Sequence, residues 1–290
     1  MPRVYKSLIR REFQEHRVLW IAPLVVAALL LLSAVIGQVS LAVALGPSAE
    51  QRQALFGLAL WLSALPEFIT LGIITWLYTA DCLYSERRDR SILFWKSMPV
   101  SDAQTVLSKL LVGAVIVPLG VWALNLITSL VICGIYELRS LVGQVPGGAY
   151  WDTVTWLRMQ WLALSGLVVA QLWFMPVMAF LMLVSAWVRR HVQLWVLLPP
   201  LVAMVLERIV FSTHLLWDLL WYRLGGVFVM RADSITVAAS RDDAAPTLDR
   251  LFAGIDPTPV FGNIDLWLGL VVAAVFIVVT IRIRQYRDDT

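Results

Sequence analysis

The amino-acid sequence predicts an all-α polytopic membrane protein with six transmembrane helices. Hydrophobic residues make up 60% of the 290 residues and charged residues only 15%, whereas about a quarter of the residues in a soluble protein are charged. The mean hydropathy is +0.78. Six apolar segments also approach the length of about 20 residues that a helix needs to cross the hydrocarbon core. The sequence has no internal repeat and no dividing linker, so we expect residues 1–290 to form a single transmembrane domain.

The six expected spans differ in how cleanly the sequence defines them. The second is the least clean, because its apolar run begins near Ala54 and is interrupted by Pro66 and Glu67. Prolines also interrupt spans three to five, and because proline removes a backbone hydrogen bond we expect these helices to be kinked. These prolines are Pro118, Pro176, Pro199 and Pro200. The predicted spans cover residues 18–40, 60–84, 108–135, 161–188, 192–210 and 264–283.

The distribution of basic residues predicts the orientation of the spans. A cytoplasmic N-terminus places 15 of the 23 Lys and Arg residues on the cytoplasmic side, as the positive-inside rule requires. Half of the other eight lie in the long last outer loop, where the rule is weak. With six spans, we therefore expect both termini in the cytoplasm.

Residues 1–17 are predicted to form an amphipathic helix that precedes the first span. Val4, Leu8, Ile9 and Phe13 share one helical face, and the opposite face is basic. Such a helix lies in the cytoplasmic interface with its cations near anionic lipid head groups. The alternative is a basic anchor that only orients the first span.

The loop between spans two and three, residues 85–107, combines a charged run with a short apolar segment. The five charged residues Glu86–Arg90 are expected in the cytoplasm, because such residues cost about 2.5–3.5 kcal/mol each at the centre of a spanning helix. The apolar segment Ile92–Trp95 follows them. Pro99 ends any short helix before it, and Ser101 is expected to cap the helix that leads into span three.

An exposed apolar segment on a charged loop needs a partner: the lipid interface, the protein's own helices or another protein. A resemblance favours the last. The stretch "YSERRDRSILFWKSMPVSDAQTVLSK" is similar to the loop after the second span of ABC-2 type permeases, the membrane subunits of ABC exporters. Glu86, Leu93, residues 97–101 and Lys109 match the family pattern in order and spacing, and "ILFWKSMPVSD" resembles a bacterial subgroup. The chain departs from the pattern at Arg90, where many members have Gly.

The resemblance implies that the loop contains a coupling helix, which docks in a groove on a separate ATP-binding subunit. Hydrolysis there would move the spans. Aromatic side chains such as Phe94 and Trp95 are typical interface hot spots, and the charges beside them would set the angle of docking. The expected coupling residues are Glu86, Arg87, Arg88, Asp89, Ile92, Leu93, Phe94, Trp95 and Pro99.

The family also implies the composition of the complex. We expect two ATP-binding subunits, which carry ATP and Mg²⁺, together with a second copy of this chain or a homologous permease, in a bacterial inner membrane. This chain itself is expected to hold no cofactor or metal and to bind no nucleic acid. The small number of intramembrane charges favours a hydrophobic or amphipathic cargo that leaves the cytoplasm or the inner leaflet.

Residues 211–263 form the last outer loop, and its first part, "FSTHLLWDLLWYRLGG", has the pattern of an amphipathic helix that stops at Gly225. This helix either packs on the bundle or contributes to an exit gate. Ionisable residues and paired prolines inside spans are the candidates for the transport path, unless the charges reach the interface or pair with one another. These candidates are Glu67, Pro199, Pro200, Glu207 and Arg208.

The sequence argues against a catalytic role for this chain. It contains no G-x-x-x-x-G-K-[ST] phosphate-binding loop, so ATP hydrolysis is expected on the partner. An intramembrane protease is the least favoured function, because all three histidines lie in loops or at span ends and no H-E-x-x-H motif occurs. The remaining alternative is a non-transporting anchor or sensor subunit of an ABC-type complex, which the apolar loop would serve equally well.

Overall fold

The chain folds into a bundle of helices. All regular secondary structure in the residues described by the computed structural model is helical, and six helical stretches among them are long and apolar enough to cross a membrane. The chain is therefore an all-α, multi-pass membrane protein. The described residues are 2–36, 49–89, 100–145, 151–225 and 258–286. The spanning stretches are Val18–Ile36, Leu55–Arg88, Asp102–Leu141, Thr153–Trp187, Val192–Phe211 and Ile264–Tyr286.

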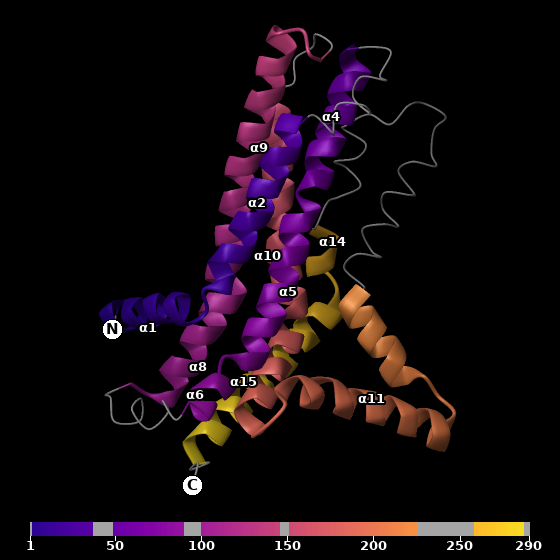
Figure 1. Cartoon of the computed structure of the whole chain (residues 1–290). Coiled ribbons are helices and arrows are strands. Elements are labelled where there is room, and N and C mark those ends of the chain that lie inside the picture. The colour runs from indigo at the N-terminus through magenta and orange to yellow at the C-terminus, as the bar shows by residue number, and fades with distance from the viewer. Residues whose placement is uncertain (1, 37–48, 90–99, 146–150, 226–257, 287–290) are drawn as a thin grey trace.

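The centre of the bundle contains five long helices (Figure 1). Helix α2 (Val18–Ile36) packs against α5 (Leu65–Asp81) and α9 (Val117–Leu141), while α10 (Thr153–Trp187) packs against α5 and α15 (Ile264–Tyr286). Many Leu, Ile and Val side chains on the outer faces remain exposed, which suits helices that contact lipid tails. The core buries Leu19, Leu71, Ile74, Tyr78, Val121, Leu167 and Met182.

The second span is interrupted where the sequence predicts. Helix α4 (Ala49–Ser63) ends just before Ala64, and α5 begins at the next residue with Pro66 in its first turn. Proline suits this position, since the first turn of a helix needs no intrahelical donor there. The two helices follow one another along the bundle (Figure 1), and α5 continues through a short turn into α6 (Tyr84–Arg88).

The third span contains a π-helical turn. It begins with α8 (Asp102–Leu111), widens in η1 (Val112–Ile116) and continues as α9. The backbone N–H of Val117 donates to the carbonyl of Val112, five residues earlier. Pro118 follows immediately, and its missing N–H together with its ring disrupts the ordinary i−4 pattern. The distortion expected at Pro118 is thus absorbed by the π-helical turn, whereas α10 and α11 (Val192–Phe211) are continuous through their prolines.

Several helices are longer than the spans that the hydropathy pattern predicts. The fourth begins at Thr153 rather than near residue 161, and its first turn is capped by Asp152, which accepts from the N–H groups of Val154 and Thr155. The third begins at Asp102 with the predicted cap at Ser101, completed by Gln104 as a capping box. Hydropathy locates the apolar part of a helix, whereas the caps set its ends.

Helix α11 is the least buried of the predicted spans. A tight turn at residues 188–191 joins it to α10, as the short predicted loop requires, and His191 adopts a left-handed conformation there. Only Val192 and Val196 of α11 are buried. The rest of the helix extends away from the other helices (Figure 1), and most of its apolar side chains are exposed in the described part of the chain.

Residues 215–225 form the helix predicted after the fifth span. They return the chain to the bundle: Trp173 of α10 donates from Nε1 to the carbonyl of Arg223 at 2.9 Å, and the Arg223 guanidinium donates to the carbonyl of Asp265 at 2.7 Å. Arg223 also lies over the Trp173 ring at 4.6 Å. This helix therefore packs on α10 and on the start of α15.

Candidate functional site

Four separate segments of the chain meet at one end of the bundle, which we call the charged end. Helix α1 (Pro2–Glu15) lies across this end and contacts α8, and the C-terminal part of α15 contacts α8 as well. Figure 1 shows both ends of the chain and α6 at the same end. The segment 90–99, which includes the predicted apolar tetrad and lies outside the described residues, connects α6 to α8 at this end.

A buried ion cluster joins these four segments. Lys109 of α8 places its Nζ 2.6 Å from Glu12 Oε1 of α1 and 3.2 Å from Glu86 Oε1 of α6. Arg284 of α15 bridges two carboxylates, with Nη1 2.7 Å from Glu86 Oε2 and Nε 2.8 Å from Asp102 Oδ1. The Lys109 side chain is only 1% exposed and the Glu86 side chain 2%. Each segment thus contributes at least one charge to the cluster.

Arg11 of α1 adds a third cation to this cluster and binds two carboxylates. Its Nη1 lies 3.3 Å from Glu86 Oε1, and its Nε lies 2.6 Å from Glu15 Oε1. The Tyr78 hydroxyl donates to the second oxygen of Glu12 at 3.0 Å. Burying a charge costs several kcal/mol by rough estimate, and only close pairing with further hydrogen bonds offsets that cost. The short distances and the filled acceptor positions meet this condition, so removal of one member would leave another charge buried without compensation.

His16 borders the cluster at the end of α1. Its ring lies edge-on to Tyr78 with the centroids 5.1 Å apart, and its Nε2 lies 3.9 Å from Glu12 Oε2. Burial lowers the pKa of His16 below the ordinary histidine value, and the nearby Glu12 carboxylate opposes this effect only in part. The ring is consequently held in its neutral form near neutral pH.

The residues on both sides of segment 90–99 bind other helices at the charged end. Before it, Leu83 and Tyr84 donate their backbone N–H groups to the Ser185 hydroxyl of α10 at 3.1 and 3.0 Å. Arg87 donates to the carbonyls of Ser185 and Val188 at the C-terminal end of α10, where unpaired carbonyls favour a cation. After the segment, Asp102 and Lys109 anchor α8 through the ion pairs described above.

The predicted coupling residues therefore divide into three groups. Glu86 is buried and Arg87 is half-buried, and both bind other helices of the bundle end. Arg88 and Asp89 are exposed and pair with each other at 3.1 Å. The others, Ile92, Leu93, Phe94, Trp95 and Pro99, lie outside the described residues.

The amphipathic face of α1 also differs from its expected surroundings. Leu8 is 6% exposed, and Ile9 and Phe13 pack against the core of the bundle. The described part of this apolar face therefore contacts the protein itself. Glu12 lies one helical turn after Leu8 and therefore on the apolar face of α1. A carboxylate on an apolar face indicates a buried partner, and the sequence prediction did not include this partner.

The predicted path residues lie apart from one another. Glu67 of α5 is fully buried and neither carboxylate oxygen has a hydrogen bond of standard geometry, although Asn125 and Thr128 of α9 face it. Glu207 does not pair with Arg208: it accepts from the Thr213 hydroxyl and from two backbone N–H groups, and so caps the helix 215–225. Arg208 contacts His214 at 2.7 Å. Pro199 and Pro200 lie on the exposed part of α11.

Within the described part of the chain, no group of His, Cys, Asp and Glu residues is arranged to hold a metal ion. Cys82 and Cys133 are both buried and free. The described side chains at the charged end interact through ion pairs, which connect α1, α6, α8 and α15.

No protein-family model, no curated protein and no solved structure matches this chain.

Proposed function

We propose that the chain is the transmembrane subunit of an ATP-driven exporter of the ABC-2 type. In this proposal the charged end faces the cytoplasm of a bacterium, and segment 90–99 contains the coupling helix. A separate ATP-binding subunit docks there and supplies the energy. The cargo is hydrophobic or amphipathic and leaves the cytoplasm or the inner leaflet.

The observation that carries the proposal is the ion cluster at both ends of segment 90–99. A force applied to this segment reaches α6 through Glu86 and α8 through Asp102 and Lys109. Because the same charges bind Glu12 of α1 and Arg284 of α15, the force also reaches the first and last spans. A loop that only touched the lipid surface would need no such connection to four helices.

The exposed helix α11 supports the second element of the proposal, a complex with two permease chains. Most of its apolar side chains are exposed in the described part of the chain, and a second copy or a homologous permease would cover them. Each permease would pair with one ATP-binding subunit, which holds ATP and Mg²⁺.

Docking tests the proposal directly. The double substitution of Phe94 and Trp95 by Ala is expected to weaken co-purification of the ATP-binding subunit by about tenfold or more, because hot-spot truncations cost about 2 kcal/mol or more. The matched control replaces Trp217 and Trp221, a stacked and exposed aromatic pair on the helix 215–225, and should leave co-purification unchanged. Equal binding by both double variants would overturn the coupling role.

Orientation is tested by single cysteines at Ser91 and Ser240. A membrane-impermeant thiol reagent added from outside should label the cysteine at position 240 and leave the one at position 91 unlabelled until the membrane is permeabilised. Outside labelling of both would refute the six-span topology.

The alternative of a non-transporting anchor makes a different prediction. Such a subunit would still bind the ATPase, but hydrolysis in reconstituted vesicles would not respond to any lipid or amphipathic compound. An exporter requires at least one compound to stimulate hydrolysis, and Glu86→Gln should reduce that stimulation while docking persists.

A further inference from the structure

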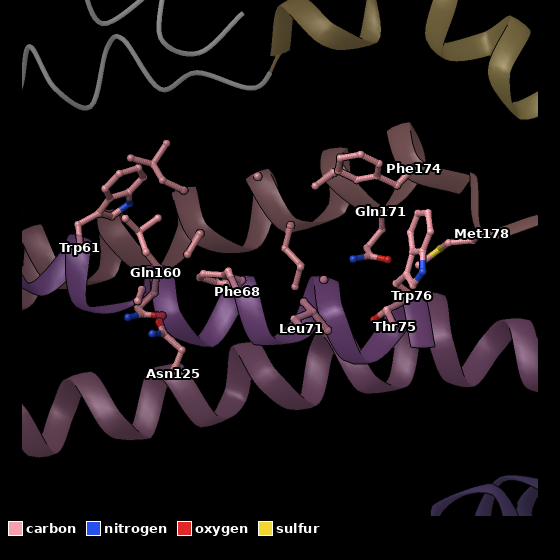
Figure 2. Close-up of a pocket in the computed structure, with 18 of the residues that line it drawn as sticks. Trp61, Phe68, Leu71, Thr75, Trp76, Asn125, Gln160, Gln171, Phe174 and Met178 are labelled. Atoms are coloured by element: carbon pink, nitrogen blue, oxygen red, sulfur yellow. The ribbon is translucent and has the colours of Figure 1, made fainter. Parts of the chain in front are cut away.

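An elongated cavity of about 460 Å³ lies within this chain, between α5 and α10, with α9 along one side. Figure 2 shows Phe68 and Leu71 of α5 along its middle and the side chains of α10 opposite them. The volume falls in the range of roughly 300–1,000 Å³ that is typical of small-molecule sites. The described residues that line the cavity come from α4, α5, α9, α10 and the helix 215–225 of one chain.

Three of the residues that line this cavity each carry a buried polar atom without a hydrogen-bond partner. They are Thr75 Oγ1 of α5 and the Oε1 atoms of Gln160 and Gln171 of α10. Thr75 is 5% exposed and Gln160 7%. An unpaired buried acceptor costs about 1–3 kcal/mol, so three around one space call for an occupant that can donate hydrogen bonds.

The Thr75 hydroxyl lacks a hydrogen bond that other threonines in these helices make. Threonine in a helix ordinarily donates its hydroxyl to the carbonyl one turn earlier. Thr70 and Thr79, on either side in the same helix, do this at 2.7 Å, and Thr128 does so at 2.9 Å. Thr75, which lines the cavity, is the only one of these four whose hydroxyl has no hydrogen-bond partner.

The polar groups lie toward the two ends of the cavity. Gln160 lies beside Asn125 and Ser129 of α9, and its amide nitrogen donates to the Ser129 hydroxyl at 3.0 Å, which leaves its oxygen as an acceptor. Gln171 points from α10 toward Thr75 near the other end (Figure 2). Eleven residues along α10 separate the two glutamines, which corresponds to roughly 16 Å of helix.

The charge of the lining restricts the ligand further. None of the described residues that line the cavity is Asp, Glu, Lys, Arg or His. An ionised group would enter a space without a counter-charge, which is strongly unfavourable in an apolar environment. A neutral ligand with an apolar middle matches the lining, and hydroxyl or amide N–H groups near its ends match the free oxygens.

We infer that this cavity is an intramembrane binding site for an uncharged, elongated amphipathic molecule that donates hydrogen bonds from both ends. Its apolar chain lies along Phe68, Leu71 and Leu167, and its donors reach Gln160 at one end and Gln171 with Thr75 at the other. The site stands on the cavity alone and does not depend on whether the chain belongs to an exporter.

The probe for this site is dodecane-1,12-diol, together with an analogue that carries a diazirine at mid-chain for photolabelling of the full chain in lipid nanodiscs. Labelling should saturate and map to peptides of α5 and α10. Unlabelled diol should compete for the site. The matched compound 1,12-dimethoxydodecane has no donors and should need about a tenfold higher concentration, the expected result of losing two hydrogen bonds. Dodecanedioate, with charged ends, should compete still less.

Two glycines give a matched pair of variants for the same experiment. Gly72 lines the cavity and Gly120 of α9 does not, and a Cβ at either position meets no atom within 4 Å. Gly72→Leu should reduce saturable labelling at least about fivefold by filling space, while Gly120→Leu, with the same gain in helix propensity, should leave it unchanged. Gln171→Met keeps the side-chain volume and should weaken competition by the diol about two- to tenfold.

Three outcomes would overturn the inference. The first is equal labelling in the Gly72→Leu and Gly120→Leu proteins. The second is equal competition by the diol and its dimethyl ether. The third is a co-purified phospholipid that protects the cavity in the wild type and is lost in Gly72→Leu, since the cavity would then hold an acyl chain.

Discussion

The charged end and the cavity are both polar regions inside an apolar helical bundle, but they differ in how their polar groups are satisfied. At the charged end, Lys109 and Glu86 each have at least two partners of opposite charge or complementary hydrogen bonding. In the cavity, Gln160, Gln171 and Thr75 each retain an unpaired oxygen. The first arrangement is complete within the chain, and the second is completed only by another molecule.

This difference indicates what each region does. A saturated ion cluster resists separation of its members, because each charge depends on the others for compensation. It is therefore suited to hold helices together and to transmit movement. An unsaturated apolar cavity is destabilising by itself, and it is suited to binding. Substitutions at the two regions should consequently have opposite effects on stability.

The largest effect is expected for Lys109→Met. The substitution keeps the length of the side chain but leaves Glu12 and Glu86 buried with less compensation, which should lower the free energy of unfolding by about 3–5 kcal/mol. Denaturant titration in detergent micelles measures this change. The matched control is Arg88→Met, because Arg88 pairs with Asp89 at the surface, where an ion pair contributes at most about 1 kcal/mol. Similar losses in both variants would show that the burial of the cluster contributes nothing to stability.

A smaller loss is expected for Arg284→Lys. Arg284 uses Nε and Nη1 to bind Asp102 and Glu86 at the same time, and a single ammonium cannot reproduce this planar geometry. We expect a loss of about 1–3 kcal/mol, comparable to one charge-assisted hydrogen bond. Arg282→Lys, two residues earlier on the exposed side of α15, is the control and should stay within about 0.5 kcal/mol of the wild type. Equal stability of the two variants would mean that Arg284 acts as a simple charge.

The sequence predicted much of the helical architecture, because that architecture follows from local patterns. Apolar length identified the spans, Pro66 marked the break in the second, and Ser101 was recognised as a cap because its side chain is close in sequence to the N–H groups it binds. These signals need no knowledge of distant contacts. The ends of the helices were less accurate, since polar residues can continue a helix beyond its apolar part.

The sequence could not predict the ion cluster or the cavity. The members of the cluster lie far apart along the chain: Lys109 follows Glu12 by 97 residues, and Arg284 follows Glu86 by 198 residues. Only the packing of α1, α6, α8 and α15 brings them together. Glu86 was expected in the cytoplasm as part of the coupling loop, and no local pattern showed that it would be buried beside Lys109 and Arg284. The free oxygens of Gln160 and Gln171 depend on the distance to α5, a property that no periodic pattern records.

Thr75→Val, in the cavity, is expected to change stability in the opposite direction from the two substitutions at the charged end. Valine has nearly the shape of threonine but no hydroxyl, so the substitution removes an unpaired buried oxygen. Without ligand, we expect the free energy of unfolding to be unchanged or to rise by up to about 1 kcal/mol. Thr79→Val is the matched control: its hydroxyl is bonded to the carbonyl of Thr75, and its removal should be neutral or destabilising. Thermal denaturation of both variants in the same detergent decides the sign, and a clear loss of stability in Thr75→Val would mean that its hydroxyl is satisfied.

The smallest effect concerns the pH dependence of the charged end. Burial lowers the pKa of His16 below its ordinary value of 6.5. The unfolded chain therefore binds a proton at this residue more readily than the folded chain does. Stability from this source is fully present above the ordinary pKa and is lost as the pH falls through that value toward the folded pKa.

His16→Phe removes the titration and preserves an aromatic ring against Tyr78. We expect the thermal midpoint of the wild type to decline between about pH 7.5 and pH 5.5, a range that brackets the ordinary histidine pKa, and the variant to decline less over the same range. The other members of the cluster are the same in both proteins, so the difference between the two curves isolates His16. A variant curve parallel to that of the wild type would show that His16 is as easily protonated in the folded chain as in the unfolded one, and that the edge of the cluster is open to water.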